Sequence, residues 1–146
     1  PLLNRPDFNR EVARMLALDE RYGGTSSVIY INFENIETQD EHGAGAADEI
    51  LKFVSDALMN KVRRSDVLGR LAKDEFGVLL PHCSNENAWK KGELLSTQLY
   101  DSLVKVWKGS TRPEISYGAY TFNEKEEIGA GLKQAATNLT KLLKKD

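Results

Sequence analysis

Two groups of charged residues near the middle of the chain have the types and spacing that a binding or catalytic site needs. Asp74 and Glu75 are adjacent carboxylates, the kind of hard oxygen ligand that Mg²⁺ prefers. Arg63 and Asp66 are separated by two residues, and an arginine guanidinium can bind a phosphate through two parallel hydrogen bonds. Each group also has a simpler explanation, namely a solvated acidic pair and an Arg–Asp pair at the end of a helix. The elements that carry the residues therefore matter.

The acidic pair lies between two short apolar runs. Residues 67–71 precede it and residues 76–80 follow it, which predicts a β-hairpin with Asp74 and Glu75 at the tip. Arg63 and Asp66 come directly before the first strand of this hairpin.

The other elements follow from apolar periodicity. The pattern predicts a first helix that begins after a loop at residues 1–5, is capped by Asn4 or Asp7, and ends at residues 22–25. Its inward face includes Leu18. The β-branched run 26–33 predicts a central strand that is covered on both faces. The remaining predictions are helices at 46–61, 84–107 and 128–145, with Met59 and Val106 facing inward, and a strand at 113–122.

Bulk properties limit the functional classes. A chain of 146 residues is expected to be one domain spanning residues 1–146. The formal net charge of −2 gives no global basic field, so DNA or RNA binding is not expected. The single cysteine, Cys83, excludes an internal disulfide and suits a reducing, cytoplasmic compartment. No apolar run reaches the roughly 18 residues of a membrane span, so no membrane contact is expected. The first residue is Pro1, which suggests a segment excised from a larger multidomain protein.

The motifs resemble those of one family. The Arg63-x-x-Asp66 pair, followed by Ala72-Lys73-Asp74-Glu75-Phe76, resembles the GGDEF domain of diguanylate cyclases, whose turn is Gly-Gly-(Asp or Glu)-Glu-Phe. The resemblance extends from Asn4 to Lys144 and includes Gln39-Asp40-x-x-Gly43 and Ser116-x-Gly118. It implies an α/β (α+β) fold that is nucleotide-cyclase-like, with a central, mostly antiparallel five-stranded sheet flanked by helices.

The resemblance also implies that catalysis is lost. Ala72 and Lys73 stand where the family has glycines that let the backbone approach phosphates closely. The family's strand aspartate, which helps to hold two divalent cations, aligns with Ile31, or with Tyr30 after a one-residue slip; its second acidic position aligns with Phe33 or Asn32. Asp74 and Glu75 are then vestigial catalytic candidates. We expect no metal and no cofactor, with residual Mg²⁺ at this acidic pair as the alternative.

The resemblance implies that some nucleotide-binding positions of the family are retained. Asp48 matches the family aspartate that binds the guanine edge of GTP, whereas Gln39 replaces the family asparagine. Asp48 also suits the first turn of a helix without any ligand. Lys73 and Lys144 complete the vestigial nucleotide-binding candidates.

In the family, RxxD is the inhibitory site, which binds an intercalated dimer of the product cyclic di-GMP. Arg63 suits a phosphate or the O6/N7 edge of guanine, and Asp66 can accept from guanine N1–H and the N2 amine. Family members often supply a second arginine from the following helix. Lys90 and Lys91 are the candidate substitutes here.

Three hypotheses follow. The first is a catalytically inactive GGDEF domain in bacterial cyclic di-GMP signalling that binds cyclic di-GMP through Arg63 and Asp66. The second is a ligand-free module that forms a homodimer or binds a signalling protein. The third, ranked last, is a weak diguanylate cyclase that binds GTP.

Overall fold

The computed structural model describes residues 2–122. The predicted helix at 128–145, with Lys144, lies outside the described residues. The elements are β1 (Leu2–Asn4), α1 (Arg5–Tyr22), β2 (Ser27–Glu34), the 3₁₀ helix η1 (Ile36–His42), α2 (Ala46–Lys61), β3 (Val67–Ala72), β4 (Glu75–Leu80), α3 (Asn85–Val106) and β5 (Glu114–Thr121).

The strands form one five-stranded sheet in the order β1-β3-β4-β2-β5. Among the strands of residues 2–122, only the β1–β3 pair is parallel, so the expected mostly antiparallel sheet is confirmed. β2 lies between β4 and β5 and is nearly all buried, as its apolar sequence predicted. The loop expected at residues 1–5 was wrong. Leu2–Asn4 pairs with β3, an interaction between segments too far apart in sequence for a local pattern to show.

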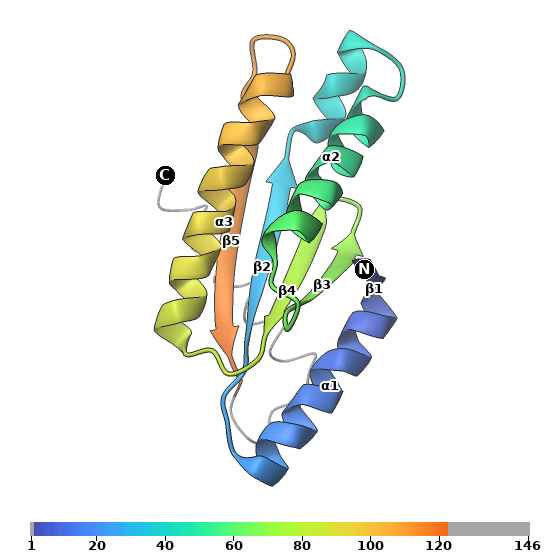
Figure 1. Ribbon diagram of the computed structural model, residues 1–146. Helices are drawn as coiled ribbons and strands as arrows, with labels where there is room; N and C mark the ends of the chain where they lie inside the picture. Colours follow the sequence, from blue (N-terminus) through green and yellow to red (C-terminus); the bar gives the residue numbers. More distant parts are fainter. Residues whose placement is uncertain (1, 123–146) are drawn as a thin grey trace.

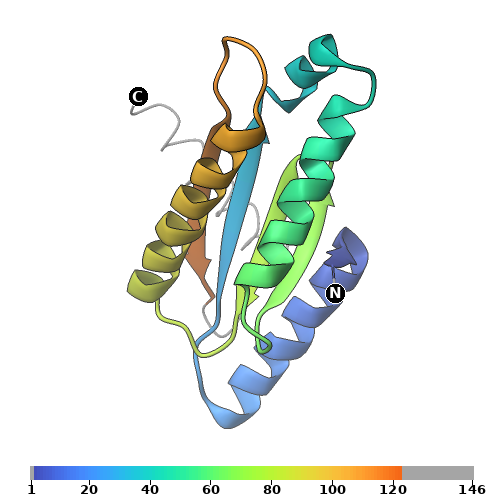
Figure 2. The same ribbon diagram turned by 45° about the horizontal axis from the view of Figure 1, so that its top comes forward.

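Helices cover the sheet on both faces (Figures 1 and 2). α2 and α3 lie side by side over one face, where they bury Ile29 and Ile31 of β2. α1 packs on the opposite face, where Phe8 and Val12 meet Val28. Alternate residues of β2 therefore belong to different cores, as the period of a strand requires.

The helices begin and end close to where the apolar periodicity predicted. Near the helix ends, however, some apolar side chains that were expected to be buried are exposed. Helix α2 begins and ends where it was predicted, and Asn4 caps α1 by accepting from Asp7 N–H at 2.9 Å. Leu18, Met59 and Val106, which were expected to face inward, are 37–39% exposed. Each lies near the end of its helix, where helical spacing continues but the sheet no longer covers the side chain.

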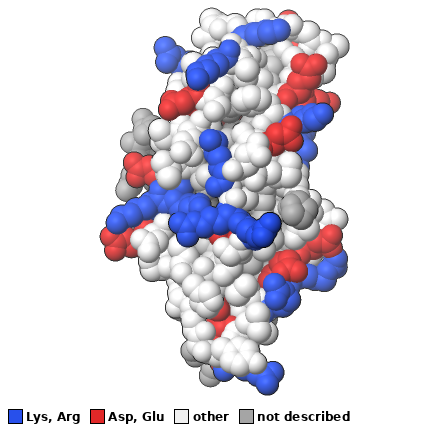
Figure 3. Space-filling model, viewed as in Figure 1, with Lys and Arg blue, Asp and Glu red and all other residues white. Residues whose placement is uncertain are grey.

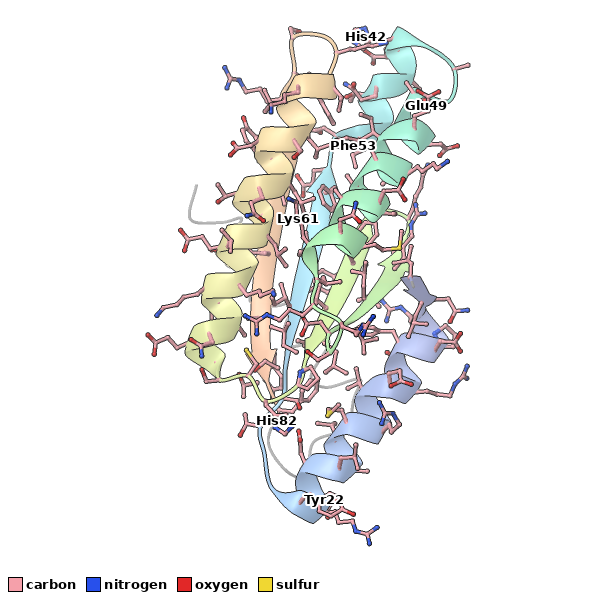
Figure 4. All side chains as sticks on the ribbon, in the orientation of Figure 1. Tyr22, His42, Glu49, Phe53, Lys61 and His82 are labelled. Atoms are coloured by element: carbon pink, nitrogen blue, oxygen red, sulfur yellow. The ribbon has the colours of Figure 1, made fainter. Side chains whose placement is uncertain are left out.

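The fold separates the two charged groups. The hairpin between β3 and β4 turns at Lys73 and Asp74, and the Arg63–Asp66 segment lies at the other end of β3. Six extended residues separate these two positions by roughly 20 Å. The two histidines of the described residues are also far apart, with His42 near one end of the molecule and His82 near the other (Figure 4).

Candidate functional site

The Arg63–Asp66 segment is a closed turn that follows α2. Asp66 N–H donates to the carbonyl of Arg63 at 3.0 Å, and Arg63 N–H donates to Asp66 Oδ2 at 3.0 Å. These two reciprocal bonds fix the aspartate side chain against the turn. Arg63 is exposed at the same turn, so the predicted pair does come together.

Helix α3 supplies a second cation to this turn. Lys91 Nζ lies 3.5 Å from Asp66 Oδ2, and the two side chains are only 20% and 5% exposed. Lys90, one residue earlier, is 70% exposed and pairs with Glu86 at 3.2 Å within its own helix. The structure therefore brings Lys91, but not Lys90, into contact with the predicted pair.

A pocket of about 440 Å³ opens beside these residues. Its lining combines the cations Arg63, Lys90 and Lys91 with Asp66 as the one acidic side chain. The rest of the wall is Ser65, Leu80, Pro81, His82, Cys83, Asn87 and Leu94. A band of lysine and arginine crosses the molecule in Figure 3. This pocket can accept an anionic ligand, with apolar wall for a base.

A smaller pocket adjoins the first. It measures about 340 Å³ and shares Arg63 and Asp66 with the larger one. Its other residues are Met59, Val62, Arg64 and Leu68. Arg64 thus lines only the smaller pocket, although it directly follows Arg63 in sequence.

Cys83 is a pocket residue that the motifs did not indicate. Burial and the negative charge of Asp66 raise the pKa of the Cys83 thiol above its ordinary value, while Lys91 and Arg63 act in the opposite direction. The thiol is therefore protonated near neutral pH. His82, Asn87 and Leu94 were also missed, because nothing in the local sequence shows that the β4–α3 connection meets the turn after α2.

The hairpin end of the sheet places Tyr30 of β2 beside the acidic pair. Tyr30 of β2 hydrogen-bonds Glu75, and the pKa of its phenol is raised by burial, by this bond and by the charge of Glu75. Ile31 and Phe33 instead point into the opposite core. Tyr30 and Asn32, which pairs directly with Glu75, thus lie on the face of β2 toward the acidic pair. A phenol that donates its proton to Glu75 does not replace a carboxylate ligand, so these residues do not fit Mg²⁺.

Hydrogen bonds to two backbone carbonyls, those of Lys73 and Asp74, fix the tip of the hairpin. Phe33 N–H donates to the carbonyl of Asp74 at 3.0 Å, and the guanidinium of Arg70 donates twice to the carbonyl of Lys73, at 3.0 and 2.6 Å. Near the hairpin tip, Glu34 of β2 lies opposite Glu114 of β5. The pKa of Glu34 is raised by partial burial, by its hydrogen bond with Glu114 and by neighbouring carboxylates.

In the segment that would bind guanine, Gln39 and Asp40 make hydrogen bonds with the backbone of other elements. The Gln39 side chain is 2% exposed; it donates to the carbonyl of Lys108 and accepts from Lys108 N–H, both at 2.9 Å. Asp40 accepts from Ala47 N–H at 3.0 Å. Asp48 is exposed in the first turn of α2, where its charge suits the helix dipole. Glu49 lies one residue further along the same turn (Figure 4).

Little space is left between this segment and the hairpin. The cavity there measures about 40 Å³. It is lined by Ile36, Glu37, Ala47, Leu51, Lys73 and Asp74. The structure therefore brings Lys73 and Asp74 together with this segment around a small cavity.

Two further properties concern the described residues only. Across residues 2–122, no three His, Cys, Asp or Glu side chains are grouped as metal ligands would be. No helix in that part of the chain has both the length and the apolar character needed to cross a membrane.

Sequence comparisons identify relatives of the whole chain. The family described as "Diguanylate cyclase, GGDEF domain" matches residues 1–146. Diguanylate cyclase DosC of Escherichia coli (strain K12) is 32% identical over 124 residues, which is 84% of this chain and 27% of that protein. Probable diguanylate cyclase DgcE of the same strain is 32% identical over 112 residues, 74% of this chain and 10% of that protein. The chain therefore spans less than a third of the length of these relatives.

Solved structures share the fold. The active GGEEF domain of a diguanylate cyclase from Vibrio cholerae has a TM-score of 0.79 at 18% identity, over 97% of this chain and 90% of that one. The GGDEF domain of DgcB from Caulobacter crescentus, in complex with c-di-GMP, has a TM-score of 0.74 at 17% sequence identity, over 95% of this chain and 81% of that one. Diguanylate cyclase SiaD from Pseudomonas aeruginosa, in complex with its activator SiaC, has a TM-score of 0.81 at 17% sequence identity, over 99% of this chain and 56% of that one. Because the family match spans residues 1–146 and DosC is 32% identical over 84% of this chain, the chain belongs to the GGDEF domain family of diguanylate cyclases.

Proposed function

We propose that this chain is a catalytically inactive GGDEF domain, part of a larger bacterial signalling protein, that binds cyclic di-GMP at the Arg63–Asp66 turn. The observation that carries the proposal is the pocket of about 440 Å³ in which Arg63, Asp66 and Lys91 lie together. The guanidinium of Arg63 suits a phosphate or the O6/N7 edge of guanine. The carboxylate of Asp66 suits the N1–H and N2 amine donors of the same base.

Three features of the hairpin end support the loss of cyclase activity. Tyr30, which aligns with the family's metal-binding aspartate after a one-residue slip, is a phenol that faces Glu75, and Ile31, which aligns with it without gaps, points into the opposite core. Ala72 and Lys73 replace the glycines that allow close approach to phosphates. The cavity of about 40 Å³ beside Asp74 is far below the several hundred Å³ of an ordinary ligand pocket. The domain is therefore proposed to need no metal and no cofactor.

Calorimetric titration of cyclic di-GMP into the wild-type domain and into Arg63→Ala tests the proposal. We expect wild-type binding at micromolar or tighter affinity, about −8 kcal/mol or better. Removing a charge-assisted contact should cost about 1.5–3 kcal/mol, which corresponds to a loss of roughly tenfold to a hundredfold in affinity.

Arg64→Ala is the matched control, because it also removes one positive charge. Arg64 directly follows Arg63 but lines only the smaller pocket. A loss as large as that of Arg63→Ala would indicate a general charge effect and not a specific contact. Full binding by Arg63→Ala would contradict the proposed site.

A second candidate function is a protein-interaction or dimerisation module without a ligand. It is favoured by apolar side chains on α3 that stay exposed, Leu94 at 55%, Val104 at 46% and Val106 at 39%. Absence of any binding heat with wild-type protein would favour this candidate, and sedimentation analysis together with capture of partner proteins would then be the next measurements.

A further inference from the structure

Helix α3 and strand β5 together present two aromatic rings at one border of the described sheet, where α3 lies over β5 (Figures 1 and 2). The rings of Trp89 and Tyr117 meet edge to face, with centroids 5.8 Å apart and an interplanar angle of 62°. Both side chains are half-buried, so each packs on the core and still leaves part of its ring exposed.

A glycine and a carboxylate on α3 complete this cluster. An added Cβ at Gly92 would lie 2.8 Å from Cδ2 of Tyr117, so the missing side chain lets the phenol ring lie against the helix. Glu93 follows Trp89 by four residues, which places the two side chains on the same flank of α3. Burial raises the pKa of the Tyr117 phenol, and the negative charge of Glu93 raises it further. The exposed carboxylate of Glu93 therefore lies near the ring pair.

The cluster carries a negative charge that no cation of the described chain neutralises. Within residues 2–122, Glu93 makes no ion pair, whereas Glu86, an acid earlier in α3, pairs with Lys90 at 3.2 Å. The cation–ring contacts in the same part of the chain both use an arginine, and both lie on other rings. A cation from another molecule can therefore approach the two rings and the carboxylate without displacing a described partner.

We propose that Trp89, Tyr117 and Glu93 form a binding site for the guanidinium group of an arginine side chain on another protein. The negative faces of aromatic rings attract cations, and tryptophan does so most strongly. A guanidinium is planar, so it can stack on the exposed part of a ring while its N–H groups donate to a carboxylate. The site is independent of the proposed function, because none of the three residues lines the pocket beside the Arg63–Asp66 turn.

The same flank of α3 offers more surface than one arginine side chain would cover. Val104 lies eleven residues after Glu93, which is close to three helical turns, so both are on this flank. Its side chain is 46% exposed. An apolar side chain in line with the cation site favours a polypeptide as the source of the guanidinium over a free small molecule.

NMR titration of the chain with N-acetyl-arginine methylamide tests the proposal. The control compound is N-acetyl-citrulline methylamide, in which a neutral urea replaces the guanidinium. The signal to follow is the indole Nε1–H of Trp89, identified by its loss in Trp89→Phe. We expect an affinity roughly two- to fivefold higher for the arginine compound, as an exposed cation–ring contact implies.

The second indole is an internal reference. Trp107 donates its Nε1–H to Thr111 Oγ1 at 3.2 Å and lies eighteen residues beyond Trp89, roughly 27 Å along the helix. Its signal should stay in place during the titration. Equal movement of both indole signals would show nonspecific association and overturn the proposal.

Two variants of α3 test the role of the carboxylate. Glu93→Gln should remove the preference for arginine over citrulline, whereas Glu86→Gln should keep it, because Glu86 already has a partner. Thermal unfolding confirms that each variant is folded at the titration temperature. Absence of any Trp89 shift, equal affinities for the two compounds, or an unchanged preference in Glu93→Gln would each overturn the proposal. Tighter binding of free L-arginine than of the blocked compound would overturn the assignment to a protein partner.

Discussion

Single side chains distinguish the two ends of this domain. At the Arg63–Asp66 turn, cations outnumber acids, and Asp66 is held by a backbone N–H and by Lys91. At the hairpin end, Glu34 and Glu114 face each other and no described cation pairs with them. An anionic ligand is therefore attracted to the first end, and a triphosphate without its metal is repelled from the second.

Tyr30 is a buried residue whose hydroxyl contacts the acidic pair of the hairpin. Its side chain is 6% exposed, and its hydroxyl bonds Glu75. The pKa of the phenol is raised from its ordinary 10.0, so the folded domain keeps this proton at a pH where the unfolded chain releases it. Stability contributed by the phenol is therefore fully present below about pH 10 and is lost as pH rises toward the folded-state pKa.

We predict that Tyr30→Phe lowers the free energy of unfolding by about 0.5–1.5 kcal/mol at pH 7, the net contribution of one hydrogen bond. The difference from wild type should shrink above about pH 10, because only wild type has a phenol at this position, and its ionisation stabilises the unfolded chain while the folded domain keeps the proton. Urea unfolding at pH 7, 9 and 10.5 measures this. Tyr22→Phe is the control, since Tyr22 is 70% exposed and its variant should follow wild type at each pH (Figure 4). A Tyr30→Phe difference that is constant from pH 7 to 10.5 would argue against the raised pKa.

At the scale of elements, side-chain contacts join the η1 segment to the loop between α3 and β5. Both ends of the Gln39 amide bond the backbone of Lys108, which lies in the loop between α3 and β5. His42 of the same segment packs against Gly109, where an added Cβ would come within 2.4 Å of its Nε2. These contacts join two loops at one end of the sheet.

Restoring the family residue at position 39 should therefore destabilise the domain. Gln39→Asn shortens the side chain by one methylene and cannot make both bonds to Lys108, so we expect a loss of about 1–3 kcal/mol in unfolding free energy. Urea unfolding measures the loss. The same change at Gln98, a half-buried residue in the interior of α3, should cost less than about 0.7 kcal/mol, the range of ordinary helix propensities. Equal costs at the two positions would show that the Lys108 contacts contribute nothing.

For the molecule as a whole, ligand-dependent stability distinguishes the candidate functions. A ligand at a hundredfold excess over its Kd adds about 2.7 kcal/mol, which for a domain of this size raises Tm by roughly 5–10 °C. We expect this shift with cyclic di-GMP and no comparable shift with GTP and Mg²⁺. Cyclic di-AMP is the control ligand, because adenine lacks the N1–H and N2 amine that Asp66 accepts.

Each departure from that pattern has a distinct meaning. A shift with GTP and Mg²⁺ would revive the cyclase hypothesis and require the cavity beside Asp74 to open. Equal shifts with both cyclic dinucleotides would indicate phosphate binding without base recognition. No shift with any nucleotide would leave the interaction module.

Local sequence patterns predict the class of the fold, the hairpin near Asp74 and the bounds of α2, because these depend on local periodicity and turn chemistry. Glu75, which was expected at the hairpin tip, instead begins β4. The sequence by itself also determined that the β2 positions carry no carboxylate in either alignment. Those properties are carried by residues close together in the chain, so the pattern is enough to predict them.

Only the tertiary structure decided which residues meet. Whether Tyr30 or Ile31 faces Glu75 depends on which face of β2 lies toward α1, and a shift of one residue reverses it. The choice between Lys90 and Lys91 depends on the rotation of α3 about its axis, where one residue turns the side chain by about 100°. Pairing of Leu2–Asn4 with β3 joins segments more than sixty residues apart. Such contacts arise from packing between distant segments, which no local pattern contains.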